Sequence, residues 1–317
     1  MRRRLREKGK GLISLFTKKK SGRGRVGLTL NDAGLGFAHY DDRQANPLRC
    51  QQVEQCRLDT PELLKSAVQA WAVGGCATTW VLRPKDYSLL LVEAPAVADA
   101  ELKEALRWRI KDMVSFDISG AVLDYFPLPD DAYRGRNKML YVAIIESSVS
   151  EAILAFTQAA GLTLDAIEIP ELALLRLKAL EGETLGTAIL GLQTPTSLIS
   201  LVSEGDLYLT RKVDTPAALI ATDVEDIEAR ASNMVLDLQR SLDYFESQIG
   251  KPPCLRLLVC PLQPGETPLL GQLRYNLEVE LVQLDLGEHF SCEPPLTPAL
   301  QLQVMLAVAA VLPERAV

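Results

Sequence analysis

The sequence predicts an α/β protein that is built as two lobes. Short alternating apolar runs at 26–30 and 35–40 flank the polar turn 31–34, which is the pattern of a β-hairpin, and the same plan recurs at 187–213. Beyond residue 250, apolar runs typical of parallel strands alternate with helical patterns. A chain of 317 residues with 48% hydrophobic content can bury a sizeable core. Two lobes that each open with a hairpin indicate an internal duplication.

Between the two hairpins, the chain contains an α+β module of its own. Leu102, Leu106 and Ile110 recur at helical spacing after Asp99. The predicted elements are a helix at 60–73, strands at 77–82 and 88–93, a helix from 99, strands at 121–129 and from 139, a helix at 148–160, a strand at 162–169 and a helix at 170–180. The order of elements from 99 to 180 predicts a compact module.

A long helix is the main feature of the second half. Thr222 and Glu225 form a capping box, apolar residues follow at every third or fourth position, and Gly250 with Pro252 ends the helix. Predicted elements after it are a strand at 254–262, a short helix at 268–277, a strand at 279–284 and a final helix at 297–312. The acidic, glycine-containing segment 181–186 predicts the boundary of the second lobe. The predicted parts are a basic flexible leader at 1–24, a first subdomain at 25–84, an insertion at 85–181 and a second lobe at 182–317.

The leader differs in charge from the rest of the chain. The first 25 residues hold eleven Lys or Arg and one acid, so that the remainder of a chain with net charge −7 carries −17. Leu15 and Phe16 stand beside Lys18, Lys19 and Lys20, a pairing that suits an anionic membrane surface. A disordered, solvated basic leader is the equally weighted alternative. The apolar patch is too short for a secretory signal or a membrane span, so we expect a cytoplasmic protein.

Several kinds of site are excluded by composition and spacing. The six cysteines include no C-x-x-C pair, and the two histidines, His39 and His289, stand in no metal or catalytic signature. Buried thiols in a reducing compartment, and no metal site, are therefore expected. The sequence lacks a P-loop pattern. A nucleic-acid role would depend on the leader alone, because the body at −17 repels a phosphate backbone, and we expect none.

Three segments carry a resemblance to a known family. The residues "ALRWRIKDMVSFDISGAVLDYFPLP", "KMLYVAIIESSVSEAILAFTQAAGLTLDAIEIPELALLRL" and "DLQRSLDYFESQIG" are similar to the PilM family of type IV pilus assembly proteins. The resemblance implies an actin-like, ribonuclease H-like fold with an inserted subdomain. It also implies a cytoplasmic subunit, peripheral at the inner membrane, that works with other pilus platform proteins. Its partner would be the N-terminal peptide of a bitopic PilN-like protein, held in a groove between the insertion and the first subdomain.

In such a fold, phosphate is held by small residues at each hairpin turn and Mg²⁺ by an acid at each strand end. PilM-like chains carry Asp-x-Gly at both turns. Here the first turn has Asn31 where the family has glycine, with Asp32 one residue beyond the pattern and Gly34 after it. A shift by one residue turns a side chain away from the cleft.

The second and third nucleotide elements are altered as well. The second turn offers Gln193, Thr194 and Thr196 without an acid, and the late glycine-rich turn keeps only Gly265 between prolines. We therefore expect a scaffold with a degenerate nucleotide site, neither an enzyme nor a cofactor binder. The alternative is an ATP-binding ATPase that holds Mg²⁺ through Asp32 or Asp223.

One helix segment carries a partner-binding prediction. Arg107, Trp108 and Lys111 are basic and aromatic residues of the kind that anchor interfaces, and we predict that they form a rim of the peptide groove. The alternative is a solvated helix face. A related cytoplasmic subunit of a type II secretion platform is the remaining alternative for function, although such proteins usually continue into a membrane-spanning helix and this sequence ends at Val317.

Overall fold

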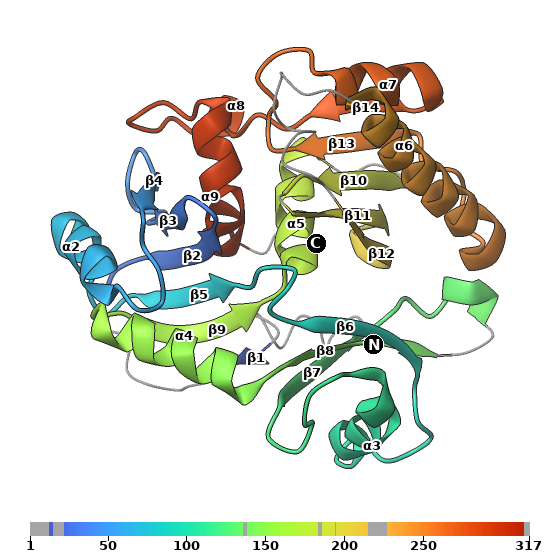
Figure 1. The fold of residues 1–317 in the computed structure, drawn as a ribbon, viewed down its shortest axis with the longest axis horizontal. Coiled ribbons are helices and arrows are strands. Elements are labelled where there is room, and N and C mark those ends of the chain that lie inside the picture. The colour runs from blue at the N-terminus through green and yellow to red at the C-terminus, as the bar shows by residue number, and fades with distance from the viewer. Residues whose placement is uncertain are drawn as a thin grey trace.

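Three β-sheets organise this computed structural model, which describes residues 13–14, 22–135, 138–182, 186–193, 195–214 and 227–313, the side chains of 13–14 and 227–230 excepted. Figure 1 shows a first lobe around one sheet, a second lobe around another, and a small sheet beneath both. The helices α5 (Pro170–Lys178) and α9 (Pro298–Val311) pack against each other where the lobes join. No helix in these ranges is both long enough and apolar enough to cross a bilayer.

The first lobe is a six-stranded sheet in the order β1-β9-β5-β2-β3-β4. Its strands are β1 (Ile13–Ser14), β2 (Arg25–Asn31), β3 (Gly34–Tyr40), β4 (Leu48–Glu54), β5 (Ala77–Val81) and β9 (Thr163–Glu168). The predicted hairpin is confirmed, because β2 pairs with β3 antiparallel over its whole length, while β2, β5 and β9 run parallel. The helices α2 (Pro61–Trp71) and α4 (Ser147–Ala159) pack against each other, α4 contacting β9.

Helix α9 returns from the second lobe to cover this sheet, which corrects the assignment of all of 182–317 to the second lobe. It packs on β2 and β3, where two glycines leave room for its backbone. A Cβ on Gly27 would lie 2.0 Å from the Ala307 carbonyl oxygen, and one on Gly36 would lie 2.3 Å from that of Gln303. The last eight residues of the helix, 304–311, are all apolar and almost fully buried. Such a helix belongs to a core and has no solvent face.

The second lobe is a five-stranded sheet in the order β12-β11-β10-β13-β14. Its strands are β10 (Thr187–Gly191), β11 (Thr196–Ser203), β12 (Asp206–Asp214), β13 (Arg256–Cys260) and β14 (Glu280–Gln283), and its helices are α6 (Ile227–Tyr244), α7 (Pro268–Asn276) and α8 (Leu286–His289). Three antiparallel strands continue into parallel β13 and β14, as predicted. Helix α6 ends in a π-helical turn, η5 (Phe245–Ile249), and Gly250 closes it in the left-handed conformation. The predicted capping box of this helix, Thr222 and Glu225, lies outside the described residues.

The inserted module is smaller than 85–181. It consists of β6 (Ser88–Glu93), α3 (Leu102–Ile110), β7 (Val122–Pro127) and β8 (Met139–Ile145), with short 3-10 turns η1 (Lys111–Met113) and η2 (Ala132–Gly135). We call these elements the insert. The sheet order is β6-β8-β7, whereas β9 pairs with β5 and so belongs to the first lobe, with α4 beside it. A third 3-10 turn, η3 (Ala179–Glu181), follows α5.

The insert uses both faces of its sheet. Leu106 and Ile110 of α3 pack with Val142 on one face, forming a small core of their own. Tyr141 and Ala143, which point the other way along β8, belong to the main core shared with the lobes. The insert is therefore fixed to the body by one face and carries α3 on its far side, as Figure 1 shows.

The predicted leader is partly ordered. Ile13 and Ser14 form β1, which pairs antiparallel with Ile167 and Ala166 of β9 at the edge of the first sheet. The prediction of a flexible leader at 1–24 is therefore wrong for these two residues. It is also wrong for 22–24, where the Gly22 N–H donates to the Gly75 carbonyl at 3.2 Å. The membrane-surface candidates Leu15, Phe16, Lys18, Lys19 and Lys20 lie outside the described residues.

Candidate nucleotide and partner sites

The first hairpin turn is closed by the side chain of Asn31. Its Oδ1 accepts hydrogen bonds from the backbone N–H groups of Ala33 and Gly34, both at 3.0 Å, and its Nδ2 donates to the Gln303 carbonyl of α9 at 3.0 Å. The side chain thus holds its own turn and ties the turn to α9. The N–H groups that would receive a phosphate in an actin-like site are bonded within the protein.

Asp32 and Gly34 do not compensate for the change at residue 31. Asp32 is exposed at the tip of the turn, and its carbonyl accepts a hydrogen bond from Arg57 at 2.8 Å. Gly34 has φ +151°, and a Cβ there would lie 2.2 Å from the Val53 carbonyl oxygen. This glycine is required for packing against β4, since a side chain has no room.

The second turn is also closed internally. The Gln193 backbone N–H donates to Ser197 Oγ at 3.1 Å, and Ser197 Oγ donates to the Gln193 carbonyl at 3.2 Å. Leu192 N–H donates to the Cys260 carbonyl at 2.7 Å. Thr196 begins β11 opposite Asp214, and Thr194 lies outside the described residues. The Gly191 at the end of β10 faces Leu174 of α5, whose Cδ1 would be 2.7 Å from an added Cβ, so this glycine serves helix packing.

The third element, the loop after β13, is folded on itself. Gln263 is 3% exposed, and its Nε2 donates to the Pro261 carbonyl at 2.7 Å while its backbone N–H donates to Gln283 at 3.1 Å. The N–H of Gly265 donates to the Gln263 carbonyl at 2.8 Å. Gly265 has φ +83° with open space around it, so that its conformation, and not a close contact, is what favours glycine.

These contacts define what the three elements offer chemically. Each presents backbone N–H groups that already have acceptors inside the protein, and none presents an acid where the family pattern needs one. Among the described residues, no three His, Cys, Asp or Glu side chains cluster as metal ligands would. A phosphate would have to displace several internal hydrogen bonds, each contributing about 1 kcal/mol net to stability.

The partner candidates on α3 have separate roles. Arg107 donates through Nη1 to the carbonyls of Ile118 and Ala121, the latter at 3.0 Å, and so fixes the loop between α3 and β7. Trp108 is 74% exposed, with Lys111 Nζ 5.6 Å from its ring centroid. Helix α3 lies on the outer face of the insert sheet, and the prediction that these residues form a rim of the peptide groove stays a prediction. Trp108 and Lys111 remain an exposed patch, and Arg107 is structural.

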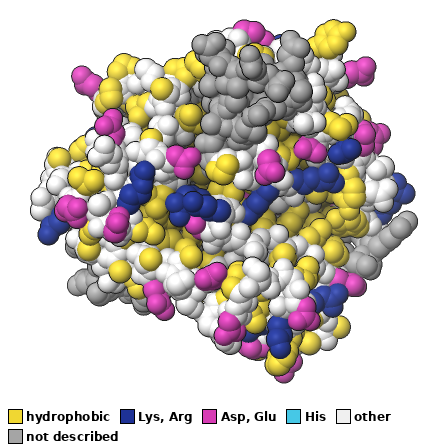
Figure 2. Space-filling model, in the orientation of Figure 1, with side chains coloured by type: hydrophobic (Ala, Val, Ile, Leu, Met, Phe, Trp, Pro, Cys, Tyr) yellow, Lys and Arg dark blue, Asp and Glu magenta, His cyan; other side chains and the backbone are white. Residues whose placement is uncertain are grey.

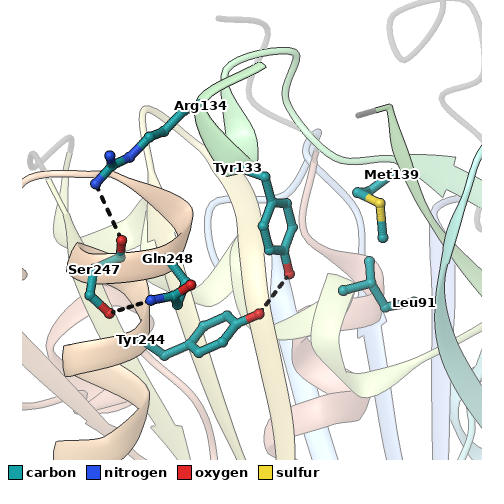
Figure 3. Close-up of a pocket in the computed structure, with 7 residues that line it drawn as sticks. All are labelled: Leu91, Tyr133, Arg134, Met139, Tyr244, Ser247 and Gln248. Carbon is teal, nitrogen blue, oxygen red and sulfur yellow. Dashed lines mark hydrogen bonds between the residues drawn. The ribbon is translucent and has the colours of Figure 1, made fainter. Parts of the chain in front are cut away.

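A cavity that the sequence did not indicate lies between the insert and the second lobe. It encloses about 600 Å³. Its described lining consists of Leu91, Tyr133, Arg134, Met139, Tyr244, Ser247 and Gln248. Figure 3 shows Tyr133 and Tyr244 directed toward each other, with Leu91 and Met139 on the opposite side. The two tyrosine hydroxyls are 3.4 Å apart. The lining residues come from β6, η2, β8 and the end of α6, which are far apart in the chain.

A buried polar junction joins the insert to both lobes. Tyr87 donates its hydroxyl proton to the Glu171 carboxylate, whose two oxygens lie 2.7 and 2.6 Å away, and Lys212 of β12 contacts the Tyr87 ring at 3.8 Å and its carbonyl at 3.1 Å. Burial raises the pKa of Glu171 above its usual range, and the hydrogen bond from Tyr87 opposes that rise. Burial and the neighbouring Glu171 also raise the pKa of Tyr87.

The prediction that the thiols are buried is confirmed for five of the six cysteines. All six are free, and five are buried. Burial raises the pKa of Cys254 and of Cys260 to about 12. Neutral, desolvated thiols of this kind are unreactive and act as small apolar side chains.

A scan against models of protein families finds no match for this sequence, and a search of curated proteins finds none either. Among solved structures, the chain is similar to the PilM-PilN type IV pilus biogenesis complex, with a TM-score of 0.69 and 17% identity over 92% of this chain and 98% of that chain. It is also similar to a Bacteroides thetaiotaomicron protein with actin-like ATPase fold and unknown function, with a TM-score of 0.50 and 10% identity over 84% of this chain and 94% of that one. The cytoplasmic domain of EpsL, an inner membrane component of the type II secretion system of Vibrio cholerae, gives a TM-score of 0.49 and 16% identity over 81% and 96% of the two chains.

The likeness at this level of identity concerns the fold. Both lobes begin with a hairpin, continue into parallel strands and are joined by two crossing helices. The α/β fold class and the inserted α+β module are therefore as predicted, and the chain has the actin-like ATPase fold.

Proposed function

We propose that this protein is a scaffold subunit of a type IV pilus assembly platform and has no ATPase activity. The similarity to the PilM-PilN complex extends over almost the whole chain and supports a platform role. The degraded turns and the basic leader favour the MSHA-type pilus system and its MshI subunit within that class. The protein would work in the cytoplasm, peripheral at the inner membrane, beside other platform proteins.

The partner in this proposal is the short cytoplasmic N-terminal peptide of a bitopic PilN-like protein. The support is the composition of the similar complex, in which PilM and PilN occur together. A peptide anchored in the bilayer at one end would bring the scaffold to the membrane, and the basic leader would add attraction to anionic lipid.

One observation carries the pseudo-ATPase part of the proposal. At each of the three nucleotide elements, the backbone N–H groups are bonded internally, to Asn31, to Ser197 and to the Gln263 carbonyl. An actin-like ATPase needs these groups free for phosphate, because oriented N–H groups and a bound Mg²⁺ hold the triphosphate. Thr29 and Gly191 stand where the family pattern has its acids, so Mg²⁺ would lack a charged ligand at both turns. The two lobes would therefore hold a fixed arrangement for protein binding.

The decisive experiment combines nucleotide and peptide binding on the full chain. Thermal unfolding with millimolar Mg-ATP should give the same midpoint as without it, because a ligand that binds only the folded state raises stability by an amount set by its concentration over Kd. A pulldown with N-terminal peptides of PilN-like proteins should retain the protein equally with and without Mg-ATP.

Two results would contradict the proposal, one for each of its parts. A magnesium-dependent thermal shift that disappears in Asp32→Ala would show that the site still holds nucleotide, and would support the ATP-binding alternative. A matched control is Asp42→Ala, which changes an exposed acid of the same lobe. Failure of every PilN-like peptide to bind would overturn the proposed partner, and it would leave the conclusion about nucleotide binding unchanged.

A further inference from the structure

The cavity between the insert and the second lobe has the chemistry of a docking site. Its volume of about 600 Å³ lies within the range of about 300–1,000 Å³ that is typical of ligand sites. Leu91 and Met139 supply apolar and adaptable surface, and Tyr133 and Tyr244 supply rigid aromatic surface with polar tips. Aromatic and methionine side chains are enriched where proteins bind segments of other proteins.

Strand β6 forms one side of the cavity and is an edge strand. Within the described residues, it pairs only with β8, so its other edge has N–H and C=O groups without a strand partner. Its sequence, SLLLVE, has three successive leucines, all half-buried. Natural edge strands are usually protected by charges, prolines or bulges, and the central residues of β6 have none of these. Leu89 and Leu91 point toward the body and the cavity, and Leu90 points toward α3.

The opposite side of the cavity contains backbone of unusual conformation. Tyr133 and Arg134 have φ of 53° and 58°, two successive non-glycine residues in the left-handed region, and the facing end of α6 is the π-helical turn η5. Left-handed residues cost about 1–2 kcal/mol each, and such strain is concentrated at binding sites. π-helical turns are likewise frequent at functional sites. The Asp131 carboxylate holds this segment to the second lobe through Lys251 at 2.5 Å and Tyr208 at 2.8 Å.

The charge of the cavity specifies the ligand further. Among the described residues that line it, the charged one is Arg134, an exposed guanidinium that donates to the Ser247 carbonyl at 3.3 Å. Arg211 lies 5.5 Å from the Tyr244 ring centroid and adds a second cation beside the lining. Figure 2 shows hydrophobic side chains in a hollow between the second lobe and the insert, with Lys and Arg side chains along its upper border. Guanidinium groups favour carboxylates, which they bind in bidentate fashion.

We propose that this cavity binds an extended peptide segment that lies along β6 as an additional strand. Alternate apolar side chains of the segment would enter the cavity between Leu91 and Tyr244, and a carboxylate would pair with Arg134, with Arg211 adding positive charge nearby. Backbone hydrogen bonds to a sheet edge give affinity in this binding mode, and pockets for alternate side chains give specificity. The site goes beyond the proposed function, because the partner peptide of that proposal is expected between the insert and the first lobe.

The proposal is tested with a designed peptide and the full chain. The probe is a fluorescein-labelled ten-residue peptide in which leucine alternates with polar residues, two of them glutamate. Six residues at about 3.3 Å each match β6, and the remainder allows for register. Fluorescence anisotropy should show saturable binding, and a matched peptide with lysine in place of glutamate should bind at least tenfold more weakly.

Variants separate the charge and the apolar contributions. Arg134→Glu changes an exposed residue, and it should reverse the preference between the two peptides. Leu91→Lys should weaken binding of the acidic peptide at least tenfold. Leu255→Lys, which changes a 68% exposed leucine of the second lobe, should leave the Kd of that peptide unchanged. Absence of saturable binding, an unchanged peptide preference in Arg134→Glu, or equal loss in Leu255→Lys would each overturn the proposal.

Discussion

The buried ion pair between Glu168 and Arg176 holds the junction of the two lobes, and its removal should destabilise the protein strongly. Arg176 of α5 binds the Glu168 carboxylate through both terminal nitrogens, one of them at 2.7 Å, and donates through Nε to the Ala309 carbonyl of α9 at 2.7 Å. The two side chains are 14% and 3% exposed. One guanidinium therefore joins the end of β9 to both crossing helices.

The size of the expected loss of stability follows from the burial of the ion pair. Arg176→Ala leaves a desolvated carboxylate without its cation, which costs about 3–5 kcal/mol when a buried pair is broken from one side. Replacing both partners, as in Glu168→Gln with Arg176→Met, removes both charges and should be less destabilising than Arg176→Ala alone. Arg240→Ala breaks the exposed pair with Asp237, whose side chains are 62% and 41% exposed, and should cost less than about 0.5 kcal/mol.

Urea unfolding of the four proteins, followed by circular dichroism and tryptophan fluorescence, measures these differences. The expected order of midpoints is wild type and Arg240→Ala highest, the double variant next, and Arg176→Ala lowest. A loss of less than about 1 kcal/mol in Arg176→Ala would refute the reasoning, because that is the cost of an exposed pair. A double variant less stable than the single one would refute the argument from unpaired charge.

Three further perturbations test the packing and the buried acid. Gly36→Ala should cost about 1–3 kcal/mol by urea unfolding, because its Cβ would meet an α9 carbonyl at 2.3 Å, whereas Gly74→Ala, whose nearest neighbour is 3.8 Å away, should be nearly neutral. Trp80→Ala should cost about 3–5 kcal/mol and Trp108→Ala less than about 0.5 kcal/mol, since the side chains are 1% and 74% exposed; equal losses would contradict the fold. Burial raises the pKa of Glu171 in the folded state, so its contribution to stability is complete below its unfolded pKa of about 4.3 and is lost as the pH rises. The difference in melting temperature between Glu171→Gln and the wild type should therefore shift in favour of Glu171→Gln as the pH rises above about 4.3, and parallel curves would contradict this.

Most of the element order was predictable because it depends on local patterns. The opening hairpin, the three antiparallel strands of the second lobe and the stop of the long helix at Gly250 all follow from turn residues and periodicity. The strand β4 was missed, since its sequence LRCQQVE is mostly polar and only one side of it is buried. Which sheet a strand joins was harder to predict from the sequence. Strand β9 follows α4 in the sequence whether it belongs to the insert or to the first lobe, and only its pairing with β5 shows that it belongs to the first lobe.

The sites depend on contacts between residues far apart in the chain, which single-sequence patterns do not reveal. The absence of a PilM-like Asp-x-Gly pattern at the first turn was visible in the sequence, but the role of Asn31 requires the Gln303 carbonyl, which lies 272 positions later. By its type and spacing Arg107 resembles an interface residue, and in the structure it donates a hydrogen bond to the loop between α3 and β7. Nothing in the sequence around Tyr133 or Tyr244 predicts a site. The two form a cavity wall only because η2 packs on the end of α6.

Several contacts among the described residues hold the two lobes in their relative position. Glu168 and Arg176 fix the crossing of α5 and α9, and Asn31 ties the first turn to α9. The Tyr87–Glu171 contact joins the entry of the insert to the start of α5. All of these are made by the protein with itself, so they persist without a ligand. Under the proposed function these contacts hold the lobes without nucleotide, so a peptide that binds the protein should meet the same surface with and without ATP.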